Sequence, residues 1–238
     1  TYAGIVKEVY KINCWLPAGT QQYFTRDQAR IESKAKRLEF LGSLAPDAEQ
    51  QQHLGQVVGF NLGQMRFARD SLFIGGTVAE TAAVLAQNLP NHSQATIIAL
   101  IRSYTLQSEM VPVVALVPLM QKFKTKGLKL GIATNDNHDA ARAHLDAHGL
   151  LPYFDFIAGA DSGFGAKPEA GMLDAFSDQM GLAPKHVAMV GDSRHDLLAG
   201  RAAGMVTVGV LTGIATKSDL ADLADVVLTN IGDLPDWL

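Results

Sequence analysis

The sequence has a single cysteine, little charge and no long apolar run. The lone Cys14 among 238 residues excludes a disulfide-stapled secreted scaffold, and we expect a reducing, cytoplasmic compartment. No stretch approaches the roughly 18 uninterrupted apolar residues of a membrane-spanning helix, and the sequence does not open on an apolar run of the signal-peptide type, so we expect no membrane partner. Charged residues make up 18% and hydrophobic residues 47%, which is typical of a globular chain with a substantial core.

The net charge of -4 is unevenly distributed along the chain. Residues 1–40 contain seven Lys and Arg against four Asp and Glu, a net charge of +3, so the remaining residues have a net charge of -7. A mildly acidic body lacks the basic footprint of a nucleic-acid-binding protein, and we expect no nucleic-acid partner. The basic stretch around Lys34, Lys36 and Arg37 is typical of a solvated helix face.

Strand and helix patterns alternate from about Leu116 to the end of the sequence. Short apolar runs predict strands over 128–133, 154–158, 187–190, 205–210 and 226–228. Amphipathic stretches predict helices over 113–126, 139–148, 172–180 and 196–203. This alternation predicts an α/β fold with a doubly wound parallel sheet and helices on both faces.

The segment from about Gln28 to Thr105 contains no convincing strand pattern and predicts a compact helical insert. The run Thr77-Val-Ala-Glu80 is a capping box that opens a helix to about Asn88. A second amphipathic helix is expected over 93–106, and Gly59-Phe60-Asn61 indicates a loop. The expected domains are an α/β core of residues 1–12 and 106–238 and a helical domain of residues 13–105.

Polar residues follow the predicted strands, where ligands bind in open α/β sheets. Thr134 and Asn135 follow the run 128–133, and a hydroxyl with adjacent backbone N–H groups would suit an anion. The alternative for both residues is ordinary capping of the next helix. Lys167 lies between a glycine loop and Pro168, and the alternative for this lysine is a surface charge.

A pair of carboxylates follows the run 187–190. Asp192 comes directly after Gly191, and Asp196 is four residues further on. Mg²⁺ prefers oxygen ligands and usually keeps several waters beside one or two carboxylates. The alternative is that Ser193 and Asp196 form a variant of the capping box while Asp192 is a turn residue. The last strand end, Leu211-Thr212-Gly213, indicates only a loop. Together, the anion cradle, the fixed lysine and the acidic pair indicate phosphate handling with Mg²⁺.

Three of these motifs resemble those of a known superfamily. Thr134-Asn135, Lys167-Pro168 and Gly191-Asp192-Ser193-x-x-Asp196 are similar to the second, third and fourth motifs of the haloacid dehalogenase superfamily. From about residue 45 onward the chain most resembles the phosphoglycolate-phosphatase-like members. The resemblance implies a Rossmannoid core with an α-helical cap.

The resemblance also implies an activity and a role for each motif residue. The chain would be a Mg²⁺-dependent phosphatase that hydrolyses a small phosphorylated metabolite, such as phosphoglycolate, through an aspartyl-phosphate. Thr134 and Lys167 would be catalytic and would bind the phosphoryl group together with Asn135. Asp192 would hold Mg²⁺ directly, and Asp196 would support it directly or through water. The protein would be a monomer or a homodimer.

The sequence departs from the superfamily in its first motif, Asp-x-Asp-Gly-Thr, because it contains no Asp-x-Asp. The opening run Ala3-Gly4-Ile5-Val6 resembles the first strand of the family, which places Glu8 at the nucleophile position and Tyr10 at the acid position. Two hypotheses stay open. Either the stretch from residue 7 to about 40 has been replaced or translated in an altered frame, or the chain is a non-catalytic relative that binds a phosphorylated ligand without turnover.

The spacing of the glycines does not match two known classes of nucleotide-binding protein. In a P-loop, four residues separate the two glycines, whereas five separate Gly159 from Gly165, and Pro168 stands where Ser or Thr would meet Mg²⁺. No Gly-x-Gly-x-x-Gly fingerprint of a dinucleotide site follows a predicted strand. A phosphoric monoester hydrolase is therefore the favoured class, and a phospho-ligand-binding pseudoenzyme is the alternative.

Overall fold

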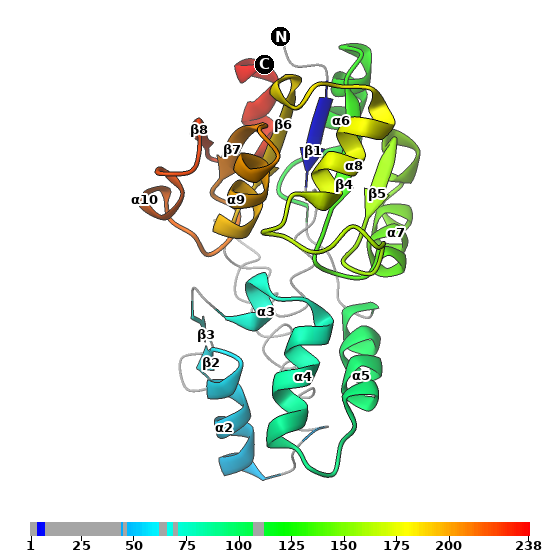
Figure 1. The fold of residues 1–238 in the computed structure, drawn as a ribbon. Coiled ribbons are helices and arrows are strands. Elements are labelled where there is room, and N and C mark those ends of the chain that lie inside the picture. The colour runs from blue at the N-terminus through cyan, green and yellow to red at the C-terminus, as the bar shows by residue number, and fades with distance from the viewer. Residues whose placement is uncertain (1–3, 8–43, 45–46, 62–65, 69–70, 107–111) are drawn as a thin grey trace. The chain divides into compact units, whose positions relative to one another are not determined.

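The computed structural model describes residues 4–7, 44, 47–61, 66–68, 71–106 and 112–238 (Figure 1). The chain divides into two compact units, one of Thr1–Lys11 with Val111–Leu238 and one of Ile12–Met110. Residues 8–43 and 107–111 hold or adjoin both expected domain boundaries and lie outside the described residues, so the boundaries at 12/13 and 105/106 stay a prediction. None of the described helices has the length and the apolar character needed to cross a membrane.

The first unit is built on a six-stranded sheet in the order β5-β4-β1-β6-β7-β8, with every neighbouring pair parallel. The strands are β1 Gly4–Lys7, β4 Lys129–Ala133, β5 Phe156–Ala158, β6 Val187–Gly191, β7 Val206–Val210 and β8 Val226–Leu228. The five strands expected after residue 116 are all present, and the prediction of a parallel α/β sheet is confirmed. The opening run forms β1, which lies between β4 and β6 at the centre of the sheet.

Helices connect the strands in the expected alternation. They are α6 Leu116–Thr125, α7 His138–Ala147, α8 Gly171–Met180, α9 Arg194–Ala202, α10 Lys217–Leu220 and α11 Leu234–Trp237, with short 3-10 turns η1 Leu151–Tyr153, η2 Pro184–His186 and η3 Ile231–Asp233. Successive side chains of a strand point to opposite faces. Val187 and Met189 of β6 therefore share one face, where they pack in a buried cluster with Phe176 of α8 and Ala199 of α9.

The connections that leave the neighbouring strands β1 and β6 lead to opposite sides of the sheet. From β1 the chain reaches β4 and then β5 on one side, whereas β6, β7 and β8 follow one another on the other side. Because parallel crossovers are right-handed, this reversal puts α8 and α9 on the face opposite to α6 and α7. The sheet is therefore doubly wound, as predicted, and its topological switch point lies between the carboxyl ends of β1 and β6.

An aspartate immediately precedes each of the two edge strands and joins it to the neighbouring strand. Asp155, which precedes β5, donates its N–H to Leu130 O at 2.8 Å and accepts from Leu130 N at 2.9 Å through its carboxylate. Asp225, which precedes β8, makes the same exchange with Thr207 on β7, at 2.8 Å in both directions. Each carboxylate also forms an ion pair with a side chain of a helix. Lys124 of α6 lies 2.7 Å from Asp155, and Arg201 of α9 lies 2.8 Å from Asp225. These contacts fix the register of the two shortest strands of the sheet.

The second unit contains helices α2 Ala48–Val57, α3 Leu72–Gly75, α4 Val78–Asn88 and α5 Gln94–Leu106. Thr77 and Glu80 form the predicted capping box, and α4 ends at Asn88 as expected. The expectation that this segment lacks strands is wrong. Phe60–Asn61 and Arg66–Phe67 form an antiparallel pair, β2 and β3, in which Phe60 lies 4.7 Å from Phe67 between ring centroids.

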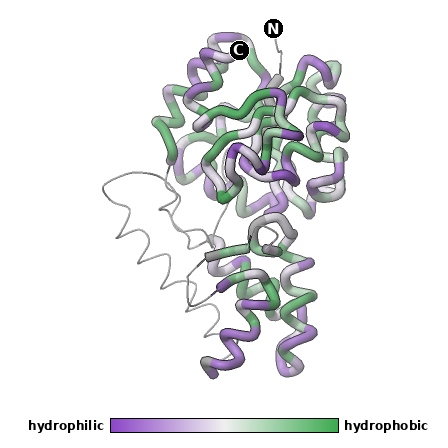
Figure 2. Tube along the Cα trace, turned by 90° about the vertical axis from the view of Figure 1, so that its left-hand side faces the viewer, coloured by the Kyte–Doolittle hydropathy of each residue, from purple (hydrophilic) through white to green (hydrophobic). Residues whose placement is uncertain are grey.

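The sequence pattern does not predict this pair, because a two-residue strand is too short to show alternation. The pair is stabilised instead by packing. Phe60 is buried in the core of the second unit with Leu54, Leu85 and Ile97. The helices around this core alternate hydrophilic and hydrophobic residues along their length, as Figure 2 shows. The second unit is thus mainly helical, with one short strand pair in the described part.

We expect Asp155→Asn to lower the stability of the first unit in a pH-dependent way. Burial raises the pKa of the Asp155 carboxyl, but hydrogen bonds from Lys124 and the Leu130 N–H, with the charges of Lys124 and Lys129, outweigh burial and hold the pKa below its ordinary value of 3.8. Because the folded-state pKa is lowered, the stabilisation is complete above pH 4 or so and is lost as the pH falls through the folded-state value.

Urea unfolding at pH 7 should show a loss of about 1–2 kcal/mol for Asp155→Asn, and the difference from the unsubstituted protein should shrink as the pH is lowered toward 3. Asp146→Asn, at an exposed position of α7, is the matched control and should change the stability by less than about 0.5 kcal/mol. An equal loss at pH 7 and pH 3 would contradict the assignment.

Candidate active site

The polar residues predicted as a site follow strands at one edge of the sheet. Thr134 comes after β4 and Asp192 comes after β6, and the carboxyl ends of parallel strands meet at the same edge. Thr134 extends the ladder by one residue, because its N–H donates to Ala158 O at 3.0 Å. Lys167 lies in the connection between β5 and α8. The structure therefore brings together at this edge the segments that the motifs singled out.

Lys167 and Asp196 form a buried ion pair. Lys167 Nζ lies 2.7 Å from Asp196 Oδ1, and the two side chains are 2% and 1% exposed. The other oxygen, Asp196 Oδ2, accepts from the Ser193 N–H at 3.0 Å and from Ser193 Oγ at 2.7 Å. A buried carboxylate with these partners has a fixed position and a compensated charge.

This pair decides between the alternatives for both residues. The interpretation of Lys167 as a surface charge is wrong, because the residue is only 4% exposed. The capping box of Ser193 and Asp196 is present at the start of α9. The same aspartate thus caps α9 and holds Lys167, which confirms the capping interpretation of Ser193 and Asp196.

Asn135 holds the backbone of Lys167. Its amide Nδ2 donates to Lys167 O at 2.8 Å, and its Oδ1 accepts from the Lys167 N–H at 2.8 Å. This reciprocal pair joins the segment after β4 to the segment that precedes α8. The geometry makes Asn135 a residue that positions Lys167. The peptide bond between Lys167 and Pro168 is cis.

Helix α7 is not capped by Thr134 or Asn135, so that alternative is wrong. The N-cap residue of α7 is Asn137, and the N–H of the first helical residue, His138, donates to Asp161 Oδ1 at 2.8 Å. Thr134 is 1% exposed, and its Oγ1 accepts from the Asp136 N–H at 3.1 Å. The hydroxyl oxygen therefore has a fixed position in a tight turn at the end of β4.

Asp192 is buried, with 7% of its surface exposed. It lies beside the loop Leu211-Thr212-Gly213, which the sequence indicated only as a loop. A Cβ atom at Gly213 would lie 2.5 Å from Asp192 Oδ2, so the backbone after β7 passes directly against the carboxylate. A Cβ atom at Gly191 would lie 2.1 Å from Asp196 Cβ. A side chain at either position would therefore displace the neighbouring aspartate. Only the packing of separate segments shows this, because Thr212-Gly213 looks like any loop in the sequence.

The donor set suits a hard cation held by few protein ligands. Among the described residues no group of three or more His, Cys, Asp or Glu side chains is placed to hold a metal ion. Mg²⁺ does not need such a group, because it is usually bound by one or two carboxylates, waters and substrate phosphate oxygens. Both oxygens of Asp196 have partners in Lys167 and Ser193, so the carboxylate of Asp196 is poorly suited to bind a cation directly.

The expected first motif follows β1. Lys7 ends this strand opposite Val190 of β6, so the chain leaves β1 at the same edge as Asp192. Glu8 and Tyr10, which stand at the nucleophile and acid positions implied by the resemblance, lie outside the described residues. The described part of the candidate site therefore contains Lys167, the Thr134 hydroxyl and the carboxylates of Asp192 and Asp196.

The fold and the three motifs can be compared with known proteins. The model of the haloacid dehalogenase-like hydrolase family matches residues 53–210, more than half of the chain. The chain belongs to this family, which confirms the resemblance drawn from the three motifs.

Two curated relatives narrow the comparison. Probable phosphatase IndB of Dickeya dadantii (strain 3937) is 40% identical over 97 residues, 41% of this chain and 42% of that protein. Phosphoglycolate phosphatase of Escherichia coli (strain K12) is 35% identical over 113 residues, 47% of this chain and 44% of that protein. The aligned part of the chain thus spans less than half the length of these relatives.

Solved structures show the same fold at low sequence identity. A predicted phosphoglycolate phosphatase from Haemophilus somnus 129pt superimposes with a TM-score of 0.69 at 15% identity, covering 99% of this chain and 97% of that one. β-Phosphoglucomutase from Clostridium difficile superimposes with a TM-score of 0.63 at 15% identity, covering 98% and 93%. These two likenesses support the α/β fold with its insert.

We expect Lys167→Met to destabilise the protein strongly, because it leaves the Asp196 carboxylate buried without its cation. The expected loss in the free energy of unfolding is about 3–5 kcal/mol, measured by urea denaturation. Adding Asp196→Asn to Lys167→Met removes the stranded charge and should recover part of this loss. Lys185→Met, at an exposed position, is the matched control. A loss below about 1 kcal/mol for Lys167→Met would contradict a buried pair.

Proposed function

We propose that this chain is a Mg²⁺-dependent phosphatase that acts on a small phosphorylated metabolite, with phosphoglycolate as the leading candidate. The observation that supports this most is the contact chain from Asn135 through Lys167 to Asp196, which joins the segments that follow β4, β5 and β6 at the edge of the sheet with the switch point. Ligands of doubly wound sheets bind in that crevice. Membership in the hydrolase family and the names of the curated relatives support the same activity.

The chain's own residues would bind and orient the phosphoryl group. A lysine ammonium group has three N–H donors, so Lys167 can donate to a phosphoryl oxygen while Asp196 holds it in place. Thr134 offers a hydroxyl at the end of the neighbouring strand. In a buried site the positive charge of Lys167 opposes the negative charge that phosphoryl transfer develops. Asn135 supports this role through the backbone of Lys167.

Asp192 would hold the cation directly, and Asp196 would support it directly or through water. Bound Mg²⁺ would neutralise phosphoryl oxygens and orient the phosphate. The aspartyl-phosphate mechanism implied by the resemblance needs a carboxylate that attacks phosphorus, and Glu8 stands at that position in this sequence. The protein would act as a monomer or a homodimer on a small-molecule partner.

A second candidate function is binding of a phosphorylated ligand without turnover. The observation that favours it is the absence of Asp-x-Asp from the sequence, since glutamate is one methylene longer than aspartate and would shift the attacking oxygen. The residues that would bind phosphate are the same for both functions, so the two differ in catalysis alone.

Release of phosphate from p-nitrophenyl phosphate separates the two functions. A phosphatase should release phosphate in the presence of Mg²⁺ and lose this activity in excess EDTA. A binding protein should release none, and its melting temperature should rise with phosphate. For an active protein, comparison of kcat/KM for phosphoglycolate with kcat/KM for several sugar phosphates tests the substrate, and a higher value for a sugar phosphate would overturn phosphoglycolate.

We expect Asp192→Asn to weaken cation binding while the fold survives, because it keeps the size of the side chain and removes its charge. Mn²⁺ titration followed by electron paramagnetic resonance should show a loss of affinity of about 10-fold or more, together with a loss of any turnover. Asp174→Asn, on the exposed side of α8, is the matched control and should leave Mn²⁺ affinity unchanged. A lower melting temperature with unchanged Mn²⁺ affinity would make Asp192 a turn residue.

A further inference from the structure

We propose that Arg194 is a positioning residue for the cation site, and that it sets the place of the Asp192 carboxylate by tying the start of α9 to the segment after β7. This inference rests on the proposed function, because it concerns the same cation. Its elements are the close approach of Gly213 to Asp192, the contacts of Arg194 with α10, and the position of Arg194 two residues after Asp192.

The segment after β7 limits where the Asp192 carboxylate can lie. The distance of 2.5 Å from a Cβ at Gly213 to Asp192 Oδ2 leaves no room for even a methyl group. A Cβ there would also lie 3.1 Å from the carbonyl oxygen of Asp192. The backbone around Gly213 therefore forms one wall of the carboxylate's site, and a shift of this segment would change the position that the carboxylate takes.

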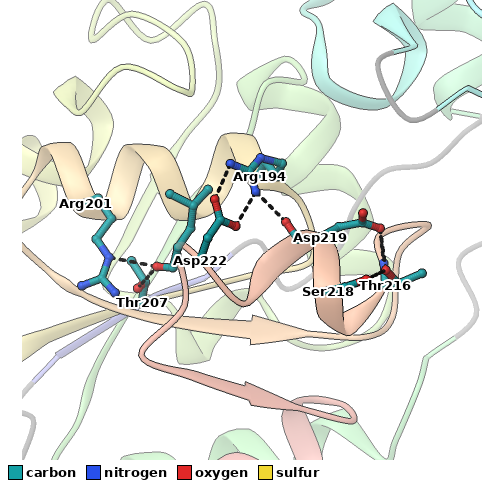
Figure 3. A network of polar contacts seen from close by, with 8 residues as sticks. Arg194, Arg201, Thr207, Thr216, Ser218, Asp219 and Asp222 are labelled. Atoms are coloured by element: carbon teal, nitrogen blue, oxygen red, sulfur yellow. Dashed lines mark hydrogen bonds and ion pairs between the residues drawn. The ribbon is translucent and has the colours of Figure 1, made fainter.

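Arg194 fastens this wall to α9. Its Nη1 donates to Asp219 O at 2.7 Å and to Asp222 Oδ1 at 2.5 Å, and its Nη2 donates to Asp222 Oδ2 at 2.8 Å. Figure 3 shows the guanidinium group projecting from α9 toward the segment with Asp219 and Asp222. The two parallel bonds to Asp222 are the bidentate geometry in which arginine fixes orientation as well as distance.

The contacts continue from Asp219 to the residues that follow Gly213. Asp219 Oδ2 accepts from the Thr216 N–H at 2.8 Å and from Thr216 Oγ1 at 2.7 Å, and this capping box starts α10. Thr216 is three residues after Gly213. The path from Arg194 to the wall of the Asp192 site thus consists of hydrogen bonds and three residues of backbone.

Stability alone is a weak reason for this arrangement. The side chains of Arg194 and Asp222 are 46% and 59% exposed, and exposed ion pairs contribute little to the free energy of unfolding. Hydrogen bonds from Arg194 lower the pKa of the Asp222 carboxyl below its ordinary value, as expected for an ion pair. The contribution of the contact lies in the geometry it imposes beside Asp192.

Arg201 provides a matched control on the same helix. It is seven residues, about two helical turns, after Arg194 and projects from the same side of α9 (Figure 3). Its Nη2 lies 2.8 Å from Asp225 Oδ1, and its Nε donates to Leu223 O at 2.9 Å. This second tie is about as exposed as the first, but it reaches the residue that precedes β8, away from the edge with Asp192.

The experiment compares Arg194→Ala, Asp222→Ala, Arg201→Ala and Asp192→Asn by Mn²⁺ titration with electron paramagnetic resonance detection and by thermal unfolding. We expect Arg194→Ala to weaken Mn²⁺ binding about 10-fold, the scale seen when an indirect support of a metal ligand is removed. Asp222→Ala should weaken Mn²⁺ binding similarly. The variant with both Arg194→Ala and Asp222→Ala should bind Mn²⁺ no more weakly than either single variant. Arg201→Ala should leave Mn²⁺ affinity unchanged whatever it does to the melting temperature.

Each outcome bears on a different claim. If Asp192→Asn abolishes Mn²⁺ binding while Arg194→Ala leaves it at the level of Arg201→Ala, the positioning role is overturned and the proposed function stands. If the unsubstituted protein binds no Mn²⁺, or Asp192→Asn has no effect, both are overturned. Equal losses of affinity in Arg194→Ala and Arg201→Ala would reduce the contact to general stabilisation of α9 and also overturn the positioning role.

Discussion

The buried ion pair between Lys167 and Asp196 joins segments from both sides of the central strand. Asp196 belongs to α9, which follows β6, while Lys167 belongs to the connection that follows β5. Removing both charges from water is costly, and the two hydrogen bonds from Ser193 to the second carboxylate oxygen help to offset that cost. The pair therefore fixes a lysine at the carboxyl edge of the sheet, where ligands of doubly wound sheets bind.

The rest of the site depends on contacts that converge on this pair. Asn135 fixes the backbone of Lys167 from the β4 side, and Ser193 holds the second oxygen of Asp196 on the β6 side. The backbone at Gly213 lies against Asp192, and Arg194 of α9 donates a hydrogen bond to Asp219 in the segment that follows Gly213. The ion pair and the Asn135 contacts thus hold the segments that follow β4, β5 and β6 together at one edge of the sheet.

Most helices and strands follow from local signals. The capping box at Thr77 and the short apolar runs of the sheet are features of a few adjacent residues, and the structure agrees with them closely. The β2–β3 pair was missed because its four residues show no periodicity and gain their stability from the packing of Phe60 and Phe67. The roles of Asn135 and Gly213 were missed for the same reason, since each depends on a residue more than 20 positions away.

The sequence by itself determined the class of fold, the order of the elements, and the presence of a lysine, a threonine and two carboxylates at the ends of strands. Periodicity, capping residues and motif spacing are local, so no tertiary contact is needed to recognise them. Only the tertiary structure decided that Lys167 is buried against Asp196, that Asn135 holds the backbone of Lys167, and that the backbone at Gly213 lies against Asp192. The physical reason is that hydrogen-bond partners and burial are set by segments that meet across the sheet.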